Sequence, residues 1–122
     1  MSKILIIEDD TDLREGLLFS FTADGDEVKG AGTKRDGLRE IAQGSYDLVL
    51  LDCNLPDGSG FDLCREVRRT DQIPIIMLTA RNTELDEIKA LELGVDDYIS
   101  KPFSLGVLKA RVKRFLRGRP DD

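Results

Sequence analysis

The chain has 122 residues, of which 40% are hydrophobic and 34% are charged, a balance typical of one soluble domain with its own core. Its net charge of −6 argues against direct binding of nucleic acid, and no apolar run approaches the roughly 20 residues of a membrane-spanning helix. The absence of histidine excludes Ser-His and Cys-His catalysis, and the spacing of Cys53 and Cys64 does not suit a zinc site.

Strand-like and helix-like segments alternate from the start of the chain. Apolar, β-branched runs predict buried strands, and apolar residues at helical spacing predict amphipathic helices. Asp10 or Thr11 can cap the first helix, which we expect to end at Asp24-Gly25. In order, the sequence predicts a strand at 3–7, a helix with Leu13, Leu17 and Phe21 inward, a weak strand at 27–30, a helix from Thr33 to Gly44 with Leu38, Ile41 and Ala42 on one side, and a strand at 46–51.

The second half continues the alternation after residues 54–60 (NLPDGSG), whose composition predicts a loop. We expect residues 1–117 to form one domain and residues 118–122 to begin a linker or a frayed end. The remaining predicted elements are a helix with Phe61, Cys64 and Val67 inward, a strand at 74–78, a helix at 84–93 that Gly94 stops, a short strand at 97–99, and a helix from about Ser104 with Leu105, Leu108, Val112 and Phe115 inward.

This pattern predicts an α/β fold of the flavodoxin-like (βα)5 kind. The five strands form a parallel sheet of order 2-1-3-4-5, with helices on both faces. Ligands bind such sheets beyond the carboxyl ends of the strands, where the strand order reverses. The residues at those ends are polar: Glu8-Asp9-Asp10 after the first strand, Asp52 after the third, Thr79 at the end of the fourth and Lys101-Pro102 after the fifth.

Clustered carboxylates at one edge need a cation or raised pKa values. Mg²⁺ suits them because it takes one or two carboxylates, a carbonyl and several waters. With Lys101 as a second positive charge and the Thr79 hydroxyl as a donor, the site suits a phosphoryl group, and Asp52 would be the nucleophile that forms an aspartyl phosphate. Asp10 is interpreted as a helix-capping acid outside the metal site. Singly, each residue has an ordinary explanation as a cap, turn or surface charge, but those explanations do not account for their joint placement.

At this point the sequence resembles the receiver domain of response regulators, the phosphoacceptor half of two-component signalling, and within it the winged-helix (OmpR/PhoB) class. The resemblance covers nearly the whole chain. The matching motifs, in order, are IIEDD (6–10), LVLLDCNLPDGSG (48–60), IPIIMLTA (73–80) and GVDDYISKPF (94–103).

The resemblance implies that Asp52 accepts a phosphoryl group from the phosphohistidine of a sensor histidine kinase, in a cytoplasmic protein that acts as a switch and not as an enzyme. Self-phosphorylation and autodephosphorylation would be its only chemical activities. The resemblance also implies that Glu8 and Asp9 form an acidic pocket, and that Asp9, Asp52 and the Asn54 backbone carbonyl bind Mg²⁺, with Mn²⁺ as a possible substitute. Thr79 and Lys101 would assist catalysis, and Thr79 and Tyr98 would change position on phosphorylation. The peptide between Lys101 and Pro102 would be cis.

Charge is unevenly distributed over the last part of the chain. Residues 84–97 carry six acids against Lys89 alone, whereas the last helix carries five basic residues and no acid. Two copies can pair such patches, and receivers of this class dimerise through the fourth helix, fifth strand and fifth helix when phosphorylated. We therefore expect a homodimer that uses Lys89, Asp96, Asp97 and Arg111. The alternative is that neighbouring helices pair these charges within one molecule.

Asn54 and Arg81 lie two residues beyond Asp52 and Thr79, at the rim of the expected pocket. Asn54 can orient a hydrolytic water, so we expect these two positions to tune the lifetime of the phosphoryl group. The alternative is that Asn54 only caps its loop.

Other functions remain open from the residues. A small Mg²⁺-dependent phosphatase would use the same chemistry but needs an acid where Asn54 stands and a cap over its substrate. A flavodoxin-like cofactor binder would need a pocket without these carboxylates. Within signalling, the chain is either a free-standing receiver that acts through protein contacts or the front of a transcription factor. The resemblance to the winged-helix class and the ending RGRPDD favour the second case, in which we expect DNA to be bound only through a domain outside these residues.

Overall fold

The computed structural model describes residues 2–117, so the linker expected at 118–122 lies outside the described residues. The strands are β1 (Lys3–Ile7), β2 (Glu27–Ala31), β3 (Leu48–Leu51), β4 (Asn54–Leu55), β5 (Gly58–Ser59), β6 (Ile75–Thr79) and β7 (Asp97–Ser100). The helices are α1 (Thr11–Ala23), α2 (Lys34–Gln43), α3 (Gly60–Val67), α4 (Glu84–Glu92) and α5 (Leu105–Arg117). None of these helices has the length and apolar character needed to cross a membrane.

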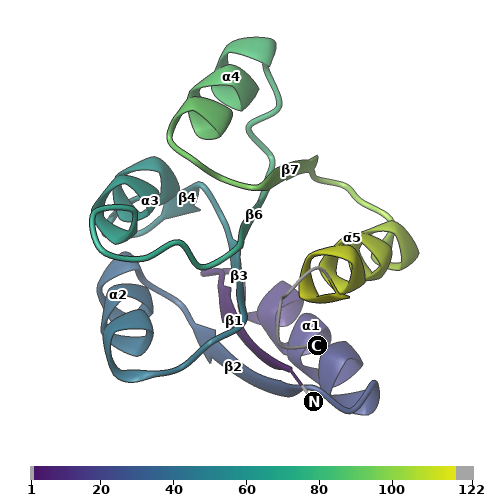
Figure 1. Ribbon diagram of the computed structural model, residues 1–122. Coiled ribbons are helices and arrows are strands. Elements are labelled where there is room, and N and C mark those ends of the chain that lie inside the picture. The colour runs from purple at the N-terminus through teal and green to yellow at the C-terminus, as the bar shows by residue number, and fades with distance from the viewer. Residues whose placement is uncertain (1, 118–122) are drawn as a thin grey trace.

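Five strands form one parallel sheet in the order β2-β1-β3-β6-β7, which confirms the predicted fold (Figure 1). The order reverses at β1 and β3, which are neighbours in the sheet and are both fully buried apart from Lys3. Their carboxyl ends therefore open side by side, and residues that follow them in the sequence meet at this edge.

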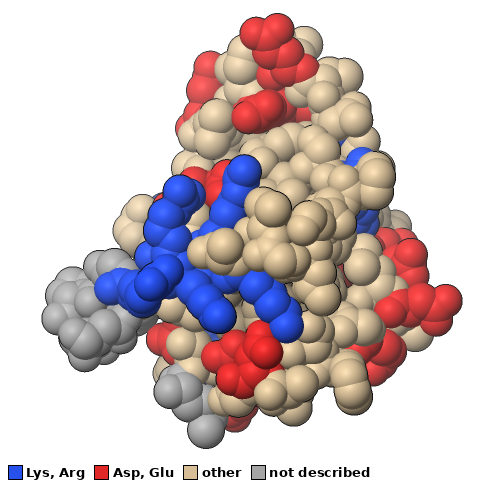
Figure 2. Space-filling view, turned by 90° about the vertical axis from the view of Figure 1, so that its right-hand side faces the viewer, with Lys and Arg blue, Asp and Glu red and all other residues tan. Residues whose placement is uncertain are grey.

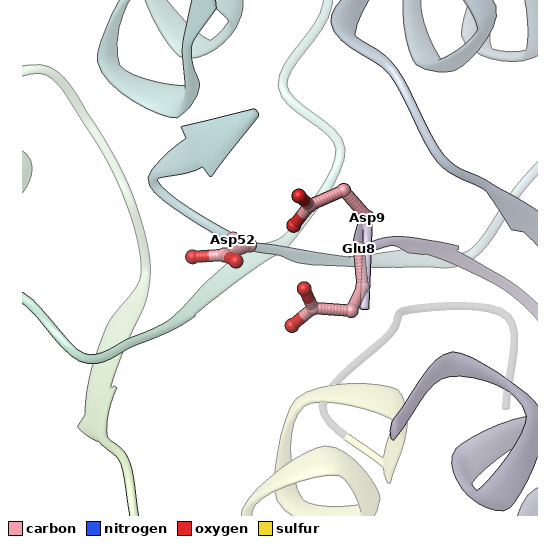
Figure 3. A group of neighbouring side chains, drawn as sticks. All are labelled: Glu8, Asp9 and Asp52. Carbon is pink, nitrogen blue, oxygen red and sulfur yellow. The ribbon is translucent and has the colours of Figure 1, made fainter. Parts of the chain in front are cut away.

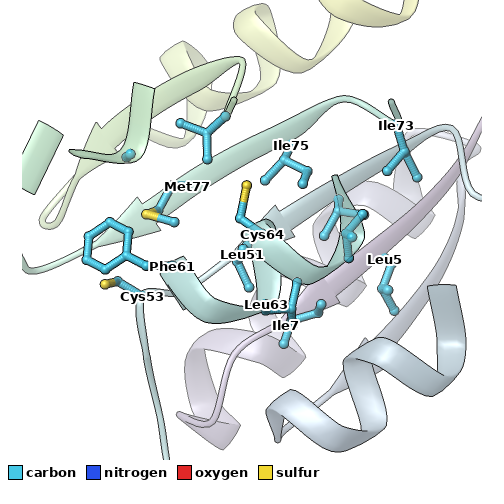
Figure 4. Close-up of a cluster of buried hydrophobic side chains, with 14 of the residues drawn as sticks. Leu5, Ile7, Leu51, Cys53, Phe61, Leu63, Cys64, Ile73, Ile75 and Met77 are labelled. Carbon is cyan, nitrogen blue, oxygen red and sulfur yellow. The ribbon is translucent and has the colours of Figure 1, made fainter. Parts of the chain in front are cut away.

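Helices cover both faces of the sheet, and each face has its own apolar core. On one face, α1 and α5 pack Leu17, Phe21, Leu108 and Val112 onto the sheet. On the other face, α2, α3 and α4 pack over a larger cluster that includes Phe61, Met77 and both cysteines (Figure 4). Cys53 and Cys64 are free thiols there, and burial raises the pKa of each.

Several helix starts follow from local chemistry. The side chains of Asp10, Thr33, Ser59 and Thr83 each accept a hydrogen bond from a backbone N–H in the first turn of α1, α2, α3 and α4, respectively. These bonds satisfy donors that a helix leaves free at its N-terminus. Of the two residues expected to cap α1, the structure has Asp10 in that position.

Two expectations differ from the structure. Residues 54–60 are not a plain loop, because β4 and β5 pair there as a two-stranded antiparallel hairpin. Leu105, expected to face inward, is 41% exposed, because it is the first residue of α5 and the packed positions begin at Leu108. The other differences are small: β3 begins at Leu48 and not at 46, and β6 begins after Pro74.

Candidate functional site

Three carboxylates meet at the edge where the strand order reverses. Glu8 and Asp9 follow β1, and Asp52 follows β3. One carboxylate oxygen of each lies within 4.8 Å of the others, and Figure 3 shows Glu8 and Asp9 turned toward the side of Asp52. Glu8 and Asp52 are 3% and 6% exposed, whereas Asp9 is exposed, so the group has a buried floor and an open rim. We call these three residues the acidic pocket.

Lys101 brings a positive charge to the acidic pocket from the loop after β7. Its Nζ donates to Glu8 Oε1 at 2.6 Å and to Asp52 Oδ2 at 3.3 Å. Its backbone N–H donates to the carbonyl oxygen of Thr79, which fixes the loop against the end of β6. The peptide between Lys101 and Pro102 is cis. One ammonium group therefore faces two buried carboxylates.

The surroundings of the pocket raise the pKa values of Glu8 and Lys101. Burial raises the pKa of Glu8 to about 7, although the hydrogen bonds from Lys101 and from the Asp10 N–H favour its charged form. Burial alone would lower the pKa of Lys101, but the hydrogen bond to Glu8 and the charge of Asp52 raise it above its usual value. The pocket holds three carboxyl groups against the one ammonium group of Lys101, an arrangement that a further cation would stabilise.

Thr79 and Tyr98, the two residues expected to act as the switch, lie on the neighbouring strands β6 and β7. Thr79 is fully buried at the end of β6, and its hydroxyl oxygen accepts a hydrogen bond from the Arg81 N–H at 3.2 Å. Tyr98 on β7 is 8% exposed, and its hydroxyl has no partner among residues 2–117. Burial raises the pKa of Tyr98 to about 12. A buried hydroxyl without a partner is costly, so this side chain gains from any rearrangement that gives it one.

Asn54 and Arg81 occupy different surroundings at the rim. The Asn54 N–H donates to Asp52 Oδ1 at 3.2 Å, and its side chain is exposed. Arg81 is drawn away from the rim, because its Nη2 pairs with Asp86 Oδ1 at 2.9 Å and its guanidinium stacks on the ring of Phe61. Of these two residues, Asn54 contacts Asp52 in this structure, whereas the Arg81 side chain contacts Asp86 and Phe61.

Charges expected at a dimer interface are already paired within the chain. Arg111 Nη1 contacts both carboxylate oxygens of Asp97, at 3.0 and 3.2 Å, and Asp96 pairs with Arg68 at 3.0 Å. Lys89 lies over the ring of Phe61 at 4.6 Å. Figure 2 shows Lys and Arg gathered over α5 and acids gathered at the top of the molecule, where α4 lies. Asp96, Asp97 and Arg111 therefore pair within one molecule, but through β7, α5 and the end of α3, and no ion pair joins α4 to α5 among residues 2–117.

Two residues near the site were missed by sequence reasoning. Arg14 of α1 donates from Nη1 to the backbone carbonyl of Glu8 at 2.7 Å. Asp57, in the hairpin loop beyond Asp52, accepts hydrogen bonds from the N–H groups of Lys34 and Arg35 and so caps α2 from a distance. No local spacing predicts either contact, because each depends on how separate elements pack.

Comparison with known proteins finds a family match along most of the chain. The family described as response regulator receiver domain matches residues 4–113. The transcriptional regulatory protein AfsQ1 of Streptomyces coelicolor is 46% identical over 96% of this chain and 52% of its own length, and the KDP operon transcriptional regulatory protein KdpE of Escherichia coli is 44% identical over the same shares. The chain thus spans about half the length of these curated relatives.

A solved structure gives the same result for the fold. A two-component response regulator from Clostridium difficile superposes with a TM-score of 0.94 and 35% identity, over 97% of this chain and 98% of that chain.

Proposed function

The chain belongs to the response regulator receiver family of two-component signalling, and we propose that Asp52 is the residue that takes the phosphoryl group. The observation that carries this proposal is the position of its carboxylate. It is 6% exposed, Lys101 Nζ bridges its Oδ2 to Glu8 Oε1, and one carboxylate oxygen each of Glu8 and Asp9 lies within 4.8 Å of one of its own.

Receiver domains bind Mg²⁺ at an acidic pocket, and the residues present here fit that ion. The three converging carboxylates are hard oxygen ligands, and one of them lies on an open rim where an ion and its waters can enter. We assign Asp9, Asp52 and the Asn54 backbone carbonyl as its ligands, with Mn²⁺ as a substitute. When bound, the ion supplies positive charge that the oxygen atoms of a phosphoryl group need.

The chemical step follows from the positions of Asp52 and Lys101. A carboxylate oxygen of Asp52 attacks the phosphorus of a phosphohistidine, the P–N bond breaks, and the imidazole leaves with the electron pair. Lys101 can release Asp52 Oδ2 and turn its ammonium group to a phosphoryl oxygen, while it keeps its shorter bond to Glu8. Hydrolysis reverses the state: water attacks phosphorus, the acyl phosphate P–O bond breaks, and inorganic phosphate and a proton are released.

The switch would begin at Thr79. Its hydroxyl oxygen is held by the Arg81 N–H, and as a donor it can turn toward a phosphoryl oxygen on Asp52. Tyr98 on the neighbouring strand β7 would follow by changing rotamer, which would give its buried hydroxyl access to a partner. Contacts that exist only in the phosphorylated state are what shift a two-state equilibrium.

The partners of this switch and its effect are proposed from what is known of the relatives. A sensor histidine kinase would be the phosphodonor, and phosphorylation would favour a homodimer through α4, β7 and α5, with Lys89, Asp96, Asp97 and Arg111 at the interface. Such a dimer must exchange the Asp97–Arg111 pair within the chain for pairs between chains. Because two relatives are named as transcriptional regulators, we place DNA binding in a further domain. Sedimentation of the beryllofluoride-treated protein tests the dimer, and a monomer at high concentration would rule it out.

The test of the phosphoacceptor is intact mass after incubation with acetyl phosphate. Wild type in Mg²⁺ should gain the mass of one phosphoryl group, and it should gain none when the metal is chelated. Asp52→Asn should gain none in either condition. A matched control is Asp47→Asn, which changes a carboxylate next to the opposite end of β3. Equal labelling of Asp52→Asn and wild type would refute the assignment.

A further inference from the structure

Arg14 connects α1 to the acidic pocket through the backbone and not through a carboxylate. Its side chain is half-buried, and its Nη1 donates to the Glu8 carbonyl oxygen at 2.7 Å. That carbonyl belongs to the peptide that joins Glu8 to Asp9, the two pocket residues that follow β1. A charged donor at this distance makes a strong hydrogen bond, so the bond holds the orientation of this peptide.

The Glu8 carbonyl needs such a partner because β2 ends too early to supply one. Ile7 pairs with Ala31 in the parallel register, and the Glu8 N–H donates to the Ala31 carbonyl at 2.9 Å. If the ladder continued, the Glu8 carbonyl would accept from the N–H of residue 33. Thr33 is instead the N-cap of α2, and β2 has ended at Ala31. Arg14 therefore supplies the hydrogen bond that the next strand residue would have made.

Two glycines make room for this side chain. A Cβ at Gly30 would lie 3.0 Å from Arg14 Cδ, and a Cβ at Gly32 would lie 3.0 Å from Arg14 Nη1. Neither glycine has a positive φ. The absence of a side chain at Gly30 and Gly32 therefore leaves space for the Arg14 side chain to lie along the end of β2.

We propose that Arg14 is a positioning residue for the cation site, which it serves by fixing the peptide from which Glu8 and Asp9 project. It is not a metal ligand and takes no part in phosphoryl transfer. The inference rests on the proposed function, because it assigns Arg14 to the Mg²⁺ site argued there. Residues that orient metal ligands typically change metal affinity by about tenfold or more when they are removed.

The first test is Mg²⁺ affinity, measured by calorimetry well below the unfolding temperature. Arg14→Met keeps most of the aliphatic stem and removes the donor, and we expect its dissociation constant to rise about tenfold. Arg14→Lys should recover part of this loss, because an ammonium group can donate to the same carbonyl. The matched control is Arg65→Met, which removes an exposed arginine from α3. A purely structural role would lower the unfolding temperature of Arg14→Met but leave its affinity for Mg²⁺ equal to that of the control.

A second variant tests the geometry without removing the arginine. Gly32→Ala places a methyl group against Arg14 Nη1 and should also weaken Mg²⁺ binding, whereas Gly16→Ala on α1, whose Cβ meets nothing within 4 Å, should not. In the Arg14→Met background, Gly32→Ala should have little further effect, because the methyl group then has no guanidinium to displace. Additive effects of the two changes would overturn the inference. If wild type itself binds no Mg²⁺, the proposed function fails; if wild type binds and Arg14→Met binds equally, only the role of Arg14 fails.

Discussion

Two regions of this molecule collect charge in opposite ways. The acidic pocket gathers carboxylates at the ends of buried strands, and the two on its floor are almost inaccessible, with Glu8 at 3% and Asp52 at 6% exposure. The surface of α4, β7 and α5 also carries many charges, but its pairs lie open to solvent: Arg111 and Arg114 are 41% and 66% exposed where they meet Asp97. The pocket holds three carboxyl groups against one half-buried ammonium group, whereas the surface pairs Asp97 with two exposed arginines.

The difference shows which charges perform chemistry. An exposed ion pair contributes only about 0–1 kcal/mol, because water screens it and two long side chains must be held in place. A buried charge left without its partner costs about 3–5 kcal/mol, so carboxylates are retained in such a position only where a cation or a function requires them. The pocket is therefore expected to respond strongly to single substitutions, and the surface weakly.

The largest expected effect follows from the loss of the pocket's own cation. Lys101→Met removes the ammonium group that faces Glu8 and Asp52 and should slow phosphorylation by acetyl phosphate about 100-fold. Lys109→Met is the matched control, because Lys109 also pairs with a carboxylate, Asp24 at 2.8 Å, but far from the site. Rates come from intact mass against time, and similar rates for the two variants would contradict the contrast between the regions.

A second expected effect concerns pH and stability. Burial raises the pKa of Glu8 in the folded state to about 7, above the usual 4.5 of an exposed Glu, so the folded state holds an extra proton between these two pH values. The contribution of Glu8 to the free energy of unfolding is therefore fully present below pH 4.5. It falls by up to about 3 kcal/mol as the pH rises through 7 and the buried carboxyl loses its proton.

Urea unfolding in metal-free buffer at several pH values measures this. The difference in free energy of unfolding between wild type and Glu8→Gln should change between pH 4.5 and 7, whereas the difference between wild type and Glu15→Gln, on the exposed face of α1, should stay constant. A constant difference for Glu8→Gln would show that burial does not govern this carboxyl.

A smaller effect is expected at the rim of the pocket. Asn54→Met removes a side chain that can orient water beside Asp52, and loss of a hydrogen bond of about 1 kcal/mol would slow dephosphorylation about fivefold. The decay of the phosphorylated protein after removal of acetyl phosphate gives the rate. Asn82→Met changes an exposed asparagine near the start of α4 and should leave it unchanged. If the phosphorylated Asn54→Met variant decays at the wild-type rate, the Asn54 side chain has no role in dephosphorylation, and only its backbone N–H contacts Asp52.

The smallest effect is expected on the exposed surface. Asp97→Asn keeps the oxygen that accepts from the Tyr98 N–H and weakens only the pairs with Arg111 and Arg114. The free energy of unfolding should fall by about 1 kcal/mol or less. A double-mutant cycle with Arg111→Met isolates the pair, and a coupling above about 2 kcal/mol would show that this surface resembles the pocket.

The sequence predicts the pocket well because topology alone brings it together. Glu8, Asp9 and Asp52 follow strands that must lie side by side in this sheet, so their convergence requires no knowledge of side-chain packing. The Arg14 bond was not predictable, because it depends on the residue at which β2 leaves the sheet. The hairpin at 54–59 and the capping of α2 by Asp57 were missed for the same reason: both depend on contacts between segments, and composition indicates only a loop.

The most direct measurement locates the phosphoryl group in the chain. The protein is phosphorylated with acetyl phosphate in Mg²⁺ and treated with borohydride, which reduces an acyl phosphate to an alcohol, and the peptides are then sequenced by mass spectrometry. We expect Asp52 alone to be converted to homoserine, in proportion to the phosphoryl group bound. Conversion at Glu8, Asp9 or another carboxylate, with Asp52 intact, would contradict it.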